Sequence, residues 1–141
     1  APFIDTLFDL FKDKITDKIT VINNVPREMI IYCNHHALRH IFINLISNAL
    51  DAIKEKGEIC IDAVAGEAHD LIYIKDTGRG IKKDNLYHIF DLYYSTKKSG
   101  YGTGLGLYFV KDVILRMNWE ITVDSVEGKG TIFTIKVRKG K

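Results

Sequence analysis

The sequence predicts an α+β fold, a two-layer sandwich in which one sheet is covered on one face by helices. Two observations support this prediction. Segments with the alternating apolar pattern of strands and segments with the helical apolar period are partly segregated along the chain. The longest helical pattern, at residues 34–56, has one continuous apolar face with a polar stripe beside it, as expected of a helix that packs on other elements.

The composition fits one globular domain. Of the 141 residues, 46% are hydrophobic and 27% are charged, and only two are proline. The net charge of +2 is too small to indicate a nucleic-acid partner. The two cysteines, Cys33 and Cys60, are interpreted as buried free thiols, since no further ligands stand at a metal-binding spacing. No apolar run approaches the roughly 20 residues that span a bilayer, so we expect a soluble chain, and Ala1, which is not an initiator residue, is compatible with a longer parent protein.

Helices and strands are predicted in a definite order along the chain. The first half contains an amphipathic helix at residues 3–13, strands at residues 19–25 and 29–33, and the long helix at residues 34–56. Asn34 is the predicted N-cap of the long helix, and Gly57 is its predicted end. The second half contains strands at 58–65 and 71–75 joined by a hairpin loop, a helical turn at 85–91, a helix at 104–117, and strands at 119–123 and 131–137 joined by a turn at 125–130.

The polar stripe of the long helix contains Asn44 and Asn48, one turn apart, followed by Asp51. Asparagine is a mediocre helix former, because its amide competes for nearby backbone groups. Two asparagines beside so apolar a face therefore call for an explanation. The amide oxygen of asparagine is a suitable ligand for Mg²⁺, which binds few protein groups and keeps its waters and phosphate oxygens.

The glycines are concentrated in two clusters, at residues 76–80 directly after a strand and at residues 100–107 directly before a helix. A glycine-rich loop that opens a helix directs free N–H groups at one place, and phosphate is the usual occupant of such a site. Tight turns alone explain one cluster equally well, but they explain poorly two clusters beside the asparagine helix. Neither spacing fits the dinucleotide or P-loop motif. Asp76, at a strand end, can accept from the exocyclic amine of adenine, and Lys97 can reach a terminal phosphate.

These segments resemble the conserved boxes of the sensor histidine kinases. Residues 44–52 (NLISNALDA) are similar to the N box, 76–80 (DTGRG) to the G1 box, 88–97 (HIFDLYYSTK) to the F box, 102–107 (GTGLGL) to the G2 box, and 128–133 (GKGTIF) to the closing glycine–threonine strand. All five occur in the family's order. The resemblance implies a Bergerat-type ATP-binding fold of the GHKL superfamily, with a mixed, mostly antiparallel sheet backed by about three helices, and a short lid at about residues 93–103 that moves when no nucleotide is bound.

The resemblance also implies a site for ATP and Mg²⁺. Asn48 matches the Mg²⁺-binding asparagine and is, with Lys97, a candidate catalytic residue. Asn44 would lie near the phosphates, Asp76 would bind the adenine amine, and Thr131 would help to fix Asp76. The turn beneath the base would be formed by Gly78 and Gly80, with Ile81 packed against the base, and the lid hinge and triphosphate cradle by Gly102, Gly104 and Gly106. Further candidate nucleotide contacts in these boxes are Asp51, Ala52, Thr103, Leu105 and Leu107.

One position bears on the reaction. In the hydrolytic members of the superfamily, the residue that matches Asn44 is a glutamate that activates water, and asparagine cannot act as such a base. The resemblance therefore implies a chain that binds ATP, hydrolyses it poorly and donates the γ-phosphoryl group to a histidine on another domain. None of the five histidines of this chain is interpreted as the acceptor; only the surroundings of His36 faintly resemble a histidine box, and those of His35, His40, His69 and His88 do not.

We therefore interpret residues 1–141 as a catalytic and ATP-binding domain that lacks the phosphoacceptor domain, with residues 1–18 as its first helix rather than the remnant of a linker. The expected partners are an upstream dimerisation domain of the same parent protein and a downstream response regulator. The isolated domain is expected to be a monomer and the parent a homodimer. The expected location is the cytoplasm, in a soluble parent or on the cytoplasmic side of a membrane-anchored one. Two alternatives stay open: a stand-alone serine kinase of the anti-sigma type, and a nucleotide-binding module without transfer activity.

Overall fold

The computed structural model describes residues 2–31, 33–91 and 106–139. Within these residues, five strands form one sheet in the order β1-β2-β3-β5-β4. The strands are β1 (Ile19–Asn24), β2 (Gly57–Val64), β3 (His69–Asp76), β4 (Glu120–Val126) and β5 (Gly130–Arg138). β1 runs parallel to β2, and all other neighbours are antiparallel. The mixed, mostly antiparallel sheet is therefore confirmed.

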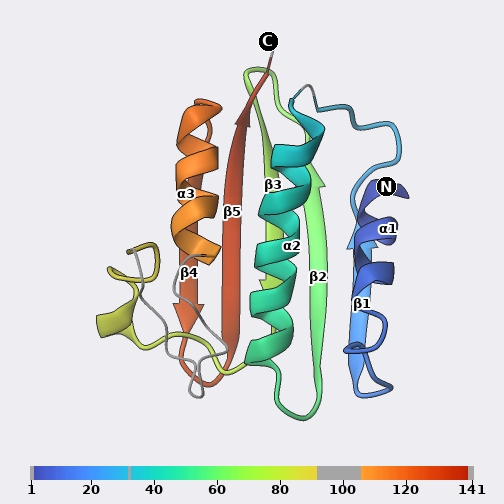
Figure 1. Ribbon diagram of the computed structural model, residues 1–141, viewed down its shortest axis with the longest axis vertical. Coiled ribbons are helices and arrows are strands. Elements are labelled where there is room, and N and C mark those ends of the chain that lie inside the picture. The colour runs from blue at the N-terminus through green and yellow to red at the C-terminus, as the bar shows by residue number, and fades with distance from the viewer. Residues whose placement is uncertain (1, 32, 92–105, 140–141) are drawn as a thin grey trace.

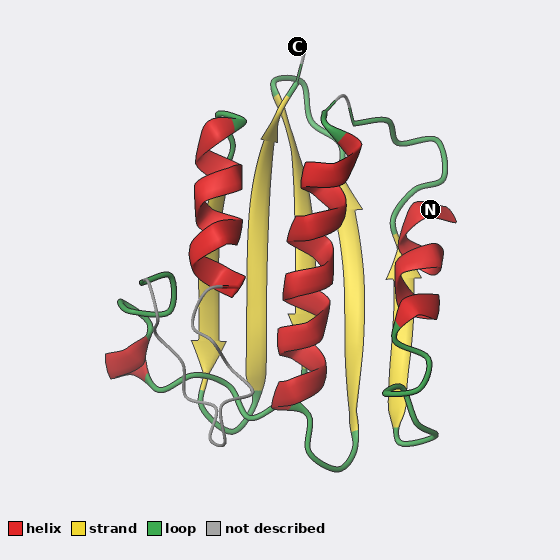
Figure 2. Ribbon diagram, viewed as in Figure 1, coloured by secondary structure: helices red, strands yellow, loops and turns green. Residues whose placement is uncertain are grey.

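The α-helices of the described residues lie side by side on one face of this sheet (Figures 1 and 2). They are α1 (Pro2–Leu10), α2 (His35–Ala52) and α3 (Gly106–Arg116). In the view of Figure 1, α3 lies in front of β4, α2 in front of β3, and α1 in front of β1, while β5 is visible between α3 and α2. This arrangement confirms the predicted two-layer sandwich. Among the described residues, none of the helices combines the length and the apolar character needed to cross a membrane.

The core lies between the sheet and the helices. All the residues predicted for the apolar face of the long helix are buried; Ile53 is buried just beyond the end of α2, and the others lie within the helix. These residues are Leu38, Ile41, Phe42, Leu45, Ile46, Ala49 and Leu50. They meet inward-facing strand residues such as Ile59, Ile74 and Ile135, each of which is almost fully buried. α1 adds Leu7 and Phe8 to the same core, so the N-terminal helix packs as part of this folded unit.

The strand predicted at residues 29–33 is wrong. Residues 29–31 and 33 form neither helix nor strand, and the Met29 amide instead closes a turn on the Pro26 carbonyl at 3.2 Å. Ile31 and Cys33 pack against the core as partly buried residues. Ile30, in contrast, is 65% exposed, so the apolar run marks only partial burial, and periodicity over so few residues does not separate a strand from an irregular segment.

The start of the long helix was predicted correctly and its end was not. Asn34 is the N-cap, and its side-chain oxygen accepts from the Ala37 amide at 3.0 Å. The helix ends at Ala52 instead of Gly57, because Ile53 turns extended and buries its side chain while the Ala52 carbonyl accepts from the Arg79 amide at 2.9 Å. Gly57 is the first residue of β2, where it pairs with Ile19.

Smaller differences concern the other boundaries. The first helix ends at Leu10 rather than at residue 13, and the helical turn predicted at 85–91 is a 3-10 helix, η1 (Lys83–Asn85), followed by turns. α3 begins, within the described residues, at Gly106. β4 continues to Val126, so Ser125 belongs to a strand and pairs with Thr131 instead of lying in the predicted turn. That last difference matters for the site.

Candidate functional site

One side of α2 connects the parts of the candidate site. Asn44, Asn48 and Ala52 are four residues apart, on three successive turns, and so span about 12 Å along the helix axis. All three are partly buried. Asn44 meets the start of α3, and Ala52 meets the segment that follows β3, as the contacts below show. Asn48 therefore lies between these two meeting points.

At the first meeting point, α3 approaches Asn44 through a glycine. A Cβ atom added to Gly106 would stand 2.8 Å from Asn44 Oδ1, so a side chain at this position would require either the Asn44 amide or the helix to shift. Asn44 Nδ2 donates to the His40 carbonyl at 2.8 Å and lies 3.3 Å from His40 Nε2. The amide nitrogen thus faces back along α2, and the amide oxygen faces the first residue of α3, the positive end of that helix dipole.

At the second meeting point, the turn after β3 presses against the end of α2. A Cβ atom on Gly78 would stand 2.6 Å from Ala52 Cβ and 2.7 Å from the Ala52 carbonyl oxygen. The next amide, of Arg79, donates to that same carbonyl at 2.9 Å. A glycine at position 78 is therefore required for this contact, which supplies a packing reason for one of the glycines that the sequence singled out.

Asp76 is the last residue of β3 and lies directly before this turn. Its carboxylate accepts from the Gly78 amide at 2.8 Å and from the backbone N–H of Thr131, its cross-strand partner on β5. Burial raises the pKa of Asp76 to about 6, because desolvation outweighs these two hydrogen bonds. Among the described residues, no ion pair includes Asp76. A carboxylate has about four lone-pair positions, so this one keeps acceptor capacity for a donor from outside the chain.

The segment of Gly78 to Ile81 is held on its other side by the β4–β5 hairpin. The Gly128 amide donates to the Arg79 carbonyl at 2.7 Å, and the Ile81 amide donates to Ser125 Oγ at 2.8 Å. Gly80 has a φ of 72° and lies against the Val126 carbonyl. The segment is thus fixed between α2 and the hairpin.

Ser125 is a contact residue that sequence reasoning missed. The sequence placed it in a turn, whereas it is an inward-facing residue of β4. The signal that identifies it is the alternation of Ile121, Val123 and Ser125, which puts a serine on the covered face of a strand, where its hydroxyl needs partners.

The remaining predicted residues fall into two groups. Ile81 and Leu107 are partly buried and pack against the core, and Thr131 is buried, with Oγ1 2.9 Å from Ser125 Oγ. The other group lies outside the described residues, as does the predicted lid at 93–103. It consists of Lys97, Gly102, Thr103, Gly104 and Leu105.

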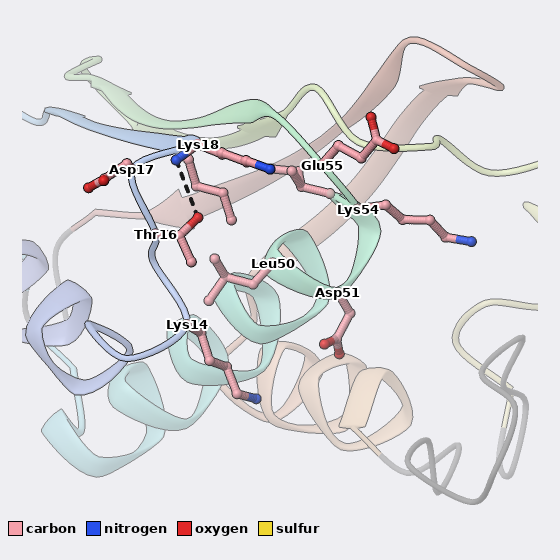
Figure 3. Close-up of a pocket in the computed structure, with 10 residues that line it drawn as sticks. Lys14, Thr16, Asp17, Lys18, Leu50, Asp51, Lys54 and Glu55 are labelled. Carbon is pink, nitrogen blue, oxygen red and sulfur yellow. Dashed lines mark hydrogen bonds between the residues drawn. The ribbon is translucent and has the colours of Figure 1, made fainter.

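Asp51 is exposed and lies away from the contacts just described. It lines a pocket of about 470 Å³ between the connection at residues 14–19 and the end of α2 (Figure 3). No other described residue of the predicted site lines this pocket. Its charged rim alternates in sign, with Lys14, Lys18 and Lys54 among three acidic side chains, so it has no single preference for an anion or a cation. The role of Asp51 at a nucleotide stays a prediction.

The class of protein follows from a comparison with known families. The family described as histidine kinase-, DNA gyrase B-, and HSP90-like ATPase matches residues 33–141. The chain belongs to this family, and the ATP-binding fold expected from the five boxes is confirmed.

Individual relatives narrow the class. Sporulation kinase E of Bacillus subtilis is 37% identical over 125 residues, which are 86% of this chain and 16% of that protein. The sensor histidine kinase WalK of Bacillus subtilis is 34% identical over 140 residues, which are 94% of this chain and 23% of that protein. The solved catalytic domain of histidine kinase ThkA superposes with a TM-score of 0.84 at 25% identity, covering 96% of this chain and 90% of that one. The chain thus has the fold of histidine kinase catalytic domains and spans less than a quarter of either curated relative.

Proposed function

We propose that this chain is the catalytic and ATP-binding domain of a two-component sensor histidine kinase, and that it donates the γ-phosphoryl group of ATP to a histidine on a separate dimerisation domain. The observation that carries the proposal is the arrangement along α2. Asp76, a hydrogen-bond acceptor suited to the adenine amine, lies beside the contact of Ala52 with Gly78. The positive end of α3 lies at the contact of Asn44 with Gly106, and Asn48 lies between these two contacts.

At the adenine end, Asp76 accepts a hydrogen bond from the exocyclic amine of the base. The carboxylate is suited to this because it is partly desolvated, which strengthens a hydrogen bond, and because two backbone donors already fix its direction. Gly78 and Gly80 form the turn beneath the base, and Ile81 packs against it. Thr131 acts on Asp76 through its backbone N–H.

At the phosphate end, the start of α3 attracts the triphosphate. Gly102, Gly104 and Gly106 cradle it, with Thr103, Leu105 and Leu107 beside them, and Lys97 binds the terminal phosphate as a point charge. Asn48 holds Mg²⁺, which neutralises negative charge on the phosphates during transfer. Asn44 orients the start of α3 through the close contact at Gly106.

Asn44 also determines whether the γ-phosphoryl group is transferred to water or to a histidine. A side-chain amide cannot take a proton from water, and the Asn44 nitrogen already donates to His40. The chain therefore hydrolyses ATP slowly. Transfer requires the imidazole of a histidine, which attacks the γ-phosphorus in line. The imidazole belongs to the upstream dimerisation domain of the parent protein, and the phosphoryl group then passes to a response regulator. The parent protein is a homodimer, in which residues 1–141 form a monomeric domain.

The nucleotide assignment is tested by measuring the dissociation constant of ATP with and without Mg²⁺. We expect Asp76→Asn to weaken binding about tenfold or more under both conditions, because a charge-assisted hydrogen bond is lost. Asn48→Ala should remove most of the gain in affinity that Mg²⁺ gives. Asp124→Asn, an exposed carboxylate on β4, is the matched control and should bind ATP as the wild type does. Unchanged affinity in Asp76→Asn would overturn the adenine assignment.

The transfer step is tested by adding the dimerisation domain of the parent protein and γ-labelled ATP. The expected product is labelled on that domain and loses its label in acid but not in alkali, as a phosphohistidine does. Label that is stable in acid and lost in alkali would indicate phosphoserine and favour the anti-sigma alternative. Rapid multiple-turnover hydrolysis by this chain alone would contradict the role given to Asn44.

A further inference from the structure

We infer that Ser125 is a positioning residue for adenine recognition, because it orients the peptide group that holds the Asp76 carboxylate. The inference rests on the proposed function, since it concerns how the same site selects its base. Ser125 itself lies on β4, which β5 separates from the strand of Asp76, and it makes no contact with the base in this scheme.

The hydroxyl of Ser125 lies within hydrogen-bond distance of three groups, which belong to two segments of the chain. Its Oγ atom lies 2.8 Å from the Ile81 amide, 2.9 Å from the Gly130 carbonyl and 2.9 Å from Thr131 Oγ1. A hydroxyl has one hydrogen to donate and two lone pairs that accept. Its hydrogen goes to the Gly130 carbonyl, because a carbonyl can only accept. Ile81 and Thr131 must then both donate to Ser125, so all of its hydrogen-bonding capacity is used.

The contact with Gly130 reaches Asp76 through a single peptide group. The carbonyl of Gly130 and the N–H of Thr131 belong to the same peptide unit, which is planar, so fixing the direction of one fixes the direction of the other. The carbonyl accepts from Ser125, and the N–H on the opposite side donates to the Asp76 carboxylate. Ser125 therefore sets the angle at which the Thr131 N–H meets the carboxylate.

The contact with Ile81 fixes the other side of the site. Ile81 follows the turn of Gly78 and Gly80, and the Gly78 amide is the second donor to Asp76. One hydroxyl thus ties together the two segments that hold the carboxylate, at its Thr131 side and at its Gly78 side. A hydrogen bond to an exocyclic amine depends steeply on angle, so selectivity for that amine depends on this arrangement.

Replacement of Ser125 by alanine removes the common partner of these groups. The Ile81 amide and the Gly130 carbonyl lose their hydrogen bond, and the peptide unit can rotate away from Asp76. Contacts with the triphosphate, at the other end of α2, are left in place. The predicted consequence is a selective loss of the energy that comes from the amine, rather than a uniform loss of nucleotide binding.

The experiment compares the dissociation constants of ATP and of inosine triphosphate, whose base carries a carbonyl oxygen in place of the amine. The wild type should bind the inosine nucleotide about tenfold or more weakly, because Asp76 then faces an acceptor. In Ser125→Ala the affinity for ATP should fall about tenfold while that for the inosine nucleotide changes by less than about twofold, so that the ratio approaches one. Ser125→Thr keeps the hydroxyl and should restore most of the ratio.

Two controls keep the outcomes distinct. Thr122→Ala removes a hydroxyl from the exposed face of the same strand and should change neither constant. If Ser125→Ala does not fold, Ser125→Cys, with a weaker donor of similar size, should show an intermediate ratio. An equal loss for both nucleotides, or no loss for either, would overturn the role of Ser125. If instead Asp76→Asn leaves the ratio at its wild-type value, the adenine assignment itself has failed.

Discussion

β3 carries an aspartate near each of its ends, and the surroundings of the two carboxylates differ. Asp70, at the end of β3 that pairs with the last residues of β5, is 2% exposed. It accepts from the Gly66 amide at 3.2 Å and lies 3.4 Å from Lys139 Nζ. Asp76, at the opposite end, is held by backbone amides, and no ion pair among the described residues includes it.

Under the proposed function, this difference separates a carboxylate that stabilises the fold from one that binds the nucleotide. A buried carboxylate is costly unless a cation and hydrogen bonds compensate it. At Asp70, the chain supplies the cation, and Lys139 also joins the hairpin to the end of β5 through the carbonyls of Gly66 and Ala68. At Asp76 the desolvation penalty is not fully compensated, as its pKa of about 6 shows. Uncompensated charges of this kind occur at sites where a ligand supplies the missing partner.

The same substitution at the two ends should have opposite effects on stability, and the larger effect is expected at Asp70. Asp70→Asn removes the negative charge that faces Lys139, although the amide oxygen can still accept from the Gly66 amide and from Lys139. We expect the free energy of unfolding to fall by about 2 kcal/mol. Urea denaturation measures this, and an ATP titration of the folded variant should give the wild-type constant, because distant sites act independently.

Lys139→Met tests the same pair from the other side. It keeps the apolar stem and removes the cation, so it should destabilise the chain by a similar amount and leave ATP binding unchanged. A stable Lys139→Met chain would show that the backbone bond from Gly66 compensates Asp70 by itself.

Asp76→Asn should make the chain more stable at pH 7. The substitution removes a charge that the fold disfavours, while its amide oxygen can still accept from Gly78. The shift of the pKa from 3.8 to about 6 sets an upper limit near 3 kcal/mol, and partial exposure reduces the expected gain to about 1–2 kcal/mol. Thermal unfolding measures the gain. A variant that is less stable and binds ATP as tightly as the wild type would mean that Asp76 is a structural carboxylate like Asp70.

The pH dependence of both quantities follows from the same raised pKa. Between about pH 4 and pH 6 the folded chain holds more protons at Asp76 than the unfolded chain, so this group's contribution to stability decreases as the pH rises through that window. ATP binding should change in the opposite sense, because the protonated acid is a poor acceptor. At pH 5.5 a group with a pKa of about 6 is roughly one quarter ionised, so binding should be about fourfold weaker than at pH 7.5.

This comparison must be made against Asp76→Asn at both pH values, because the phosphates of ATP titrate in the same range. Their effect is common to both chains and cancels in the difference. Equal pH dependence in the wild type and in Asp76→Asn would mean that the Asp76 carboxylate does not accept from the base.

The local parts of this arrangement could be predicted from the sequence, and the long-range parts could not. The apolar face of α2, its N-cap at Asn34 and the position of Asp76 at a strand end are signalled by residues close in sequence. The end of α2 is not signalled locally, since it is determined by contacts with Gly78 and the Arg79 amide, which come after β2 and β3 in the sequence. Periodicity also failed at residues 29–33, whose described residues are at most partly buried and belong to no strand.

The partners of the two carboxylates show the same limit. Asp76 was found through its motif, but nothing near Asp70 in the sequence indicates that Lys139 will neutralise it. Likewise, Ser125 meets Ile81 across 44 positions of the chain. Only the pairing of β4 with β5, and of β5 with β3, brings that serine to the end of the sheet that carries Asp76. Contacts of this kind depend on the completed topology and leave no local pattern.

The smallest effect is expected at a third carboxylate, Asp62 on β2, which completes the comparison. Asp62 lies 2.8 Å from Lys75 Nζ, and this hydrogen bond lowers the pKa of Asp62 from its ordinary value of 3.8. The two side chains are 26% and 42% exposed, so water screens the pair. Asp62→Asn should therefore cost less than about 1 kcal/mol at pH 7, and less still in high salt. Because its pKa is lowered, its contribution is present above pH 3.8 and is lost as the pH falls through the folded value, the reverse of Asp76. A loss as large as that in Asp70→Asn would contradict the argument that exposure, rather than the presence of a lysine, sets the energy of each carboxylate.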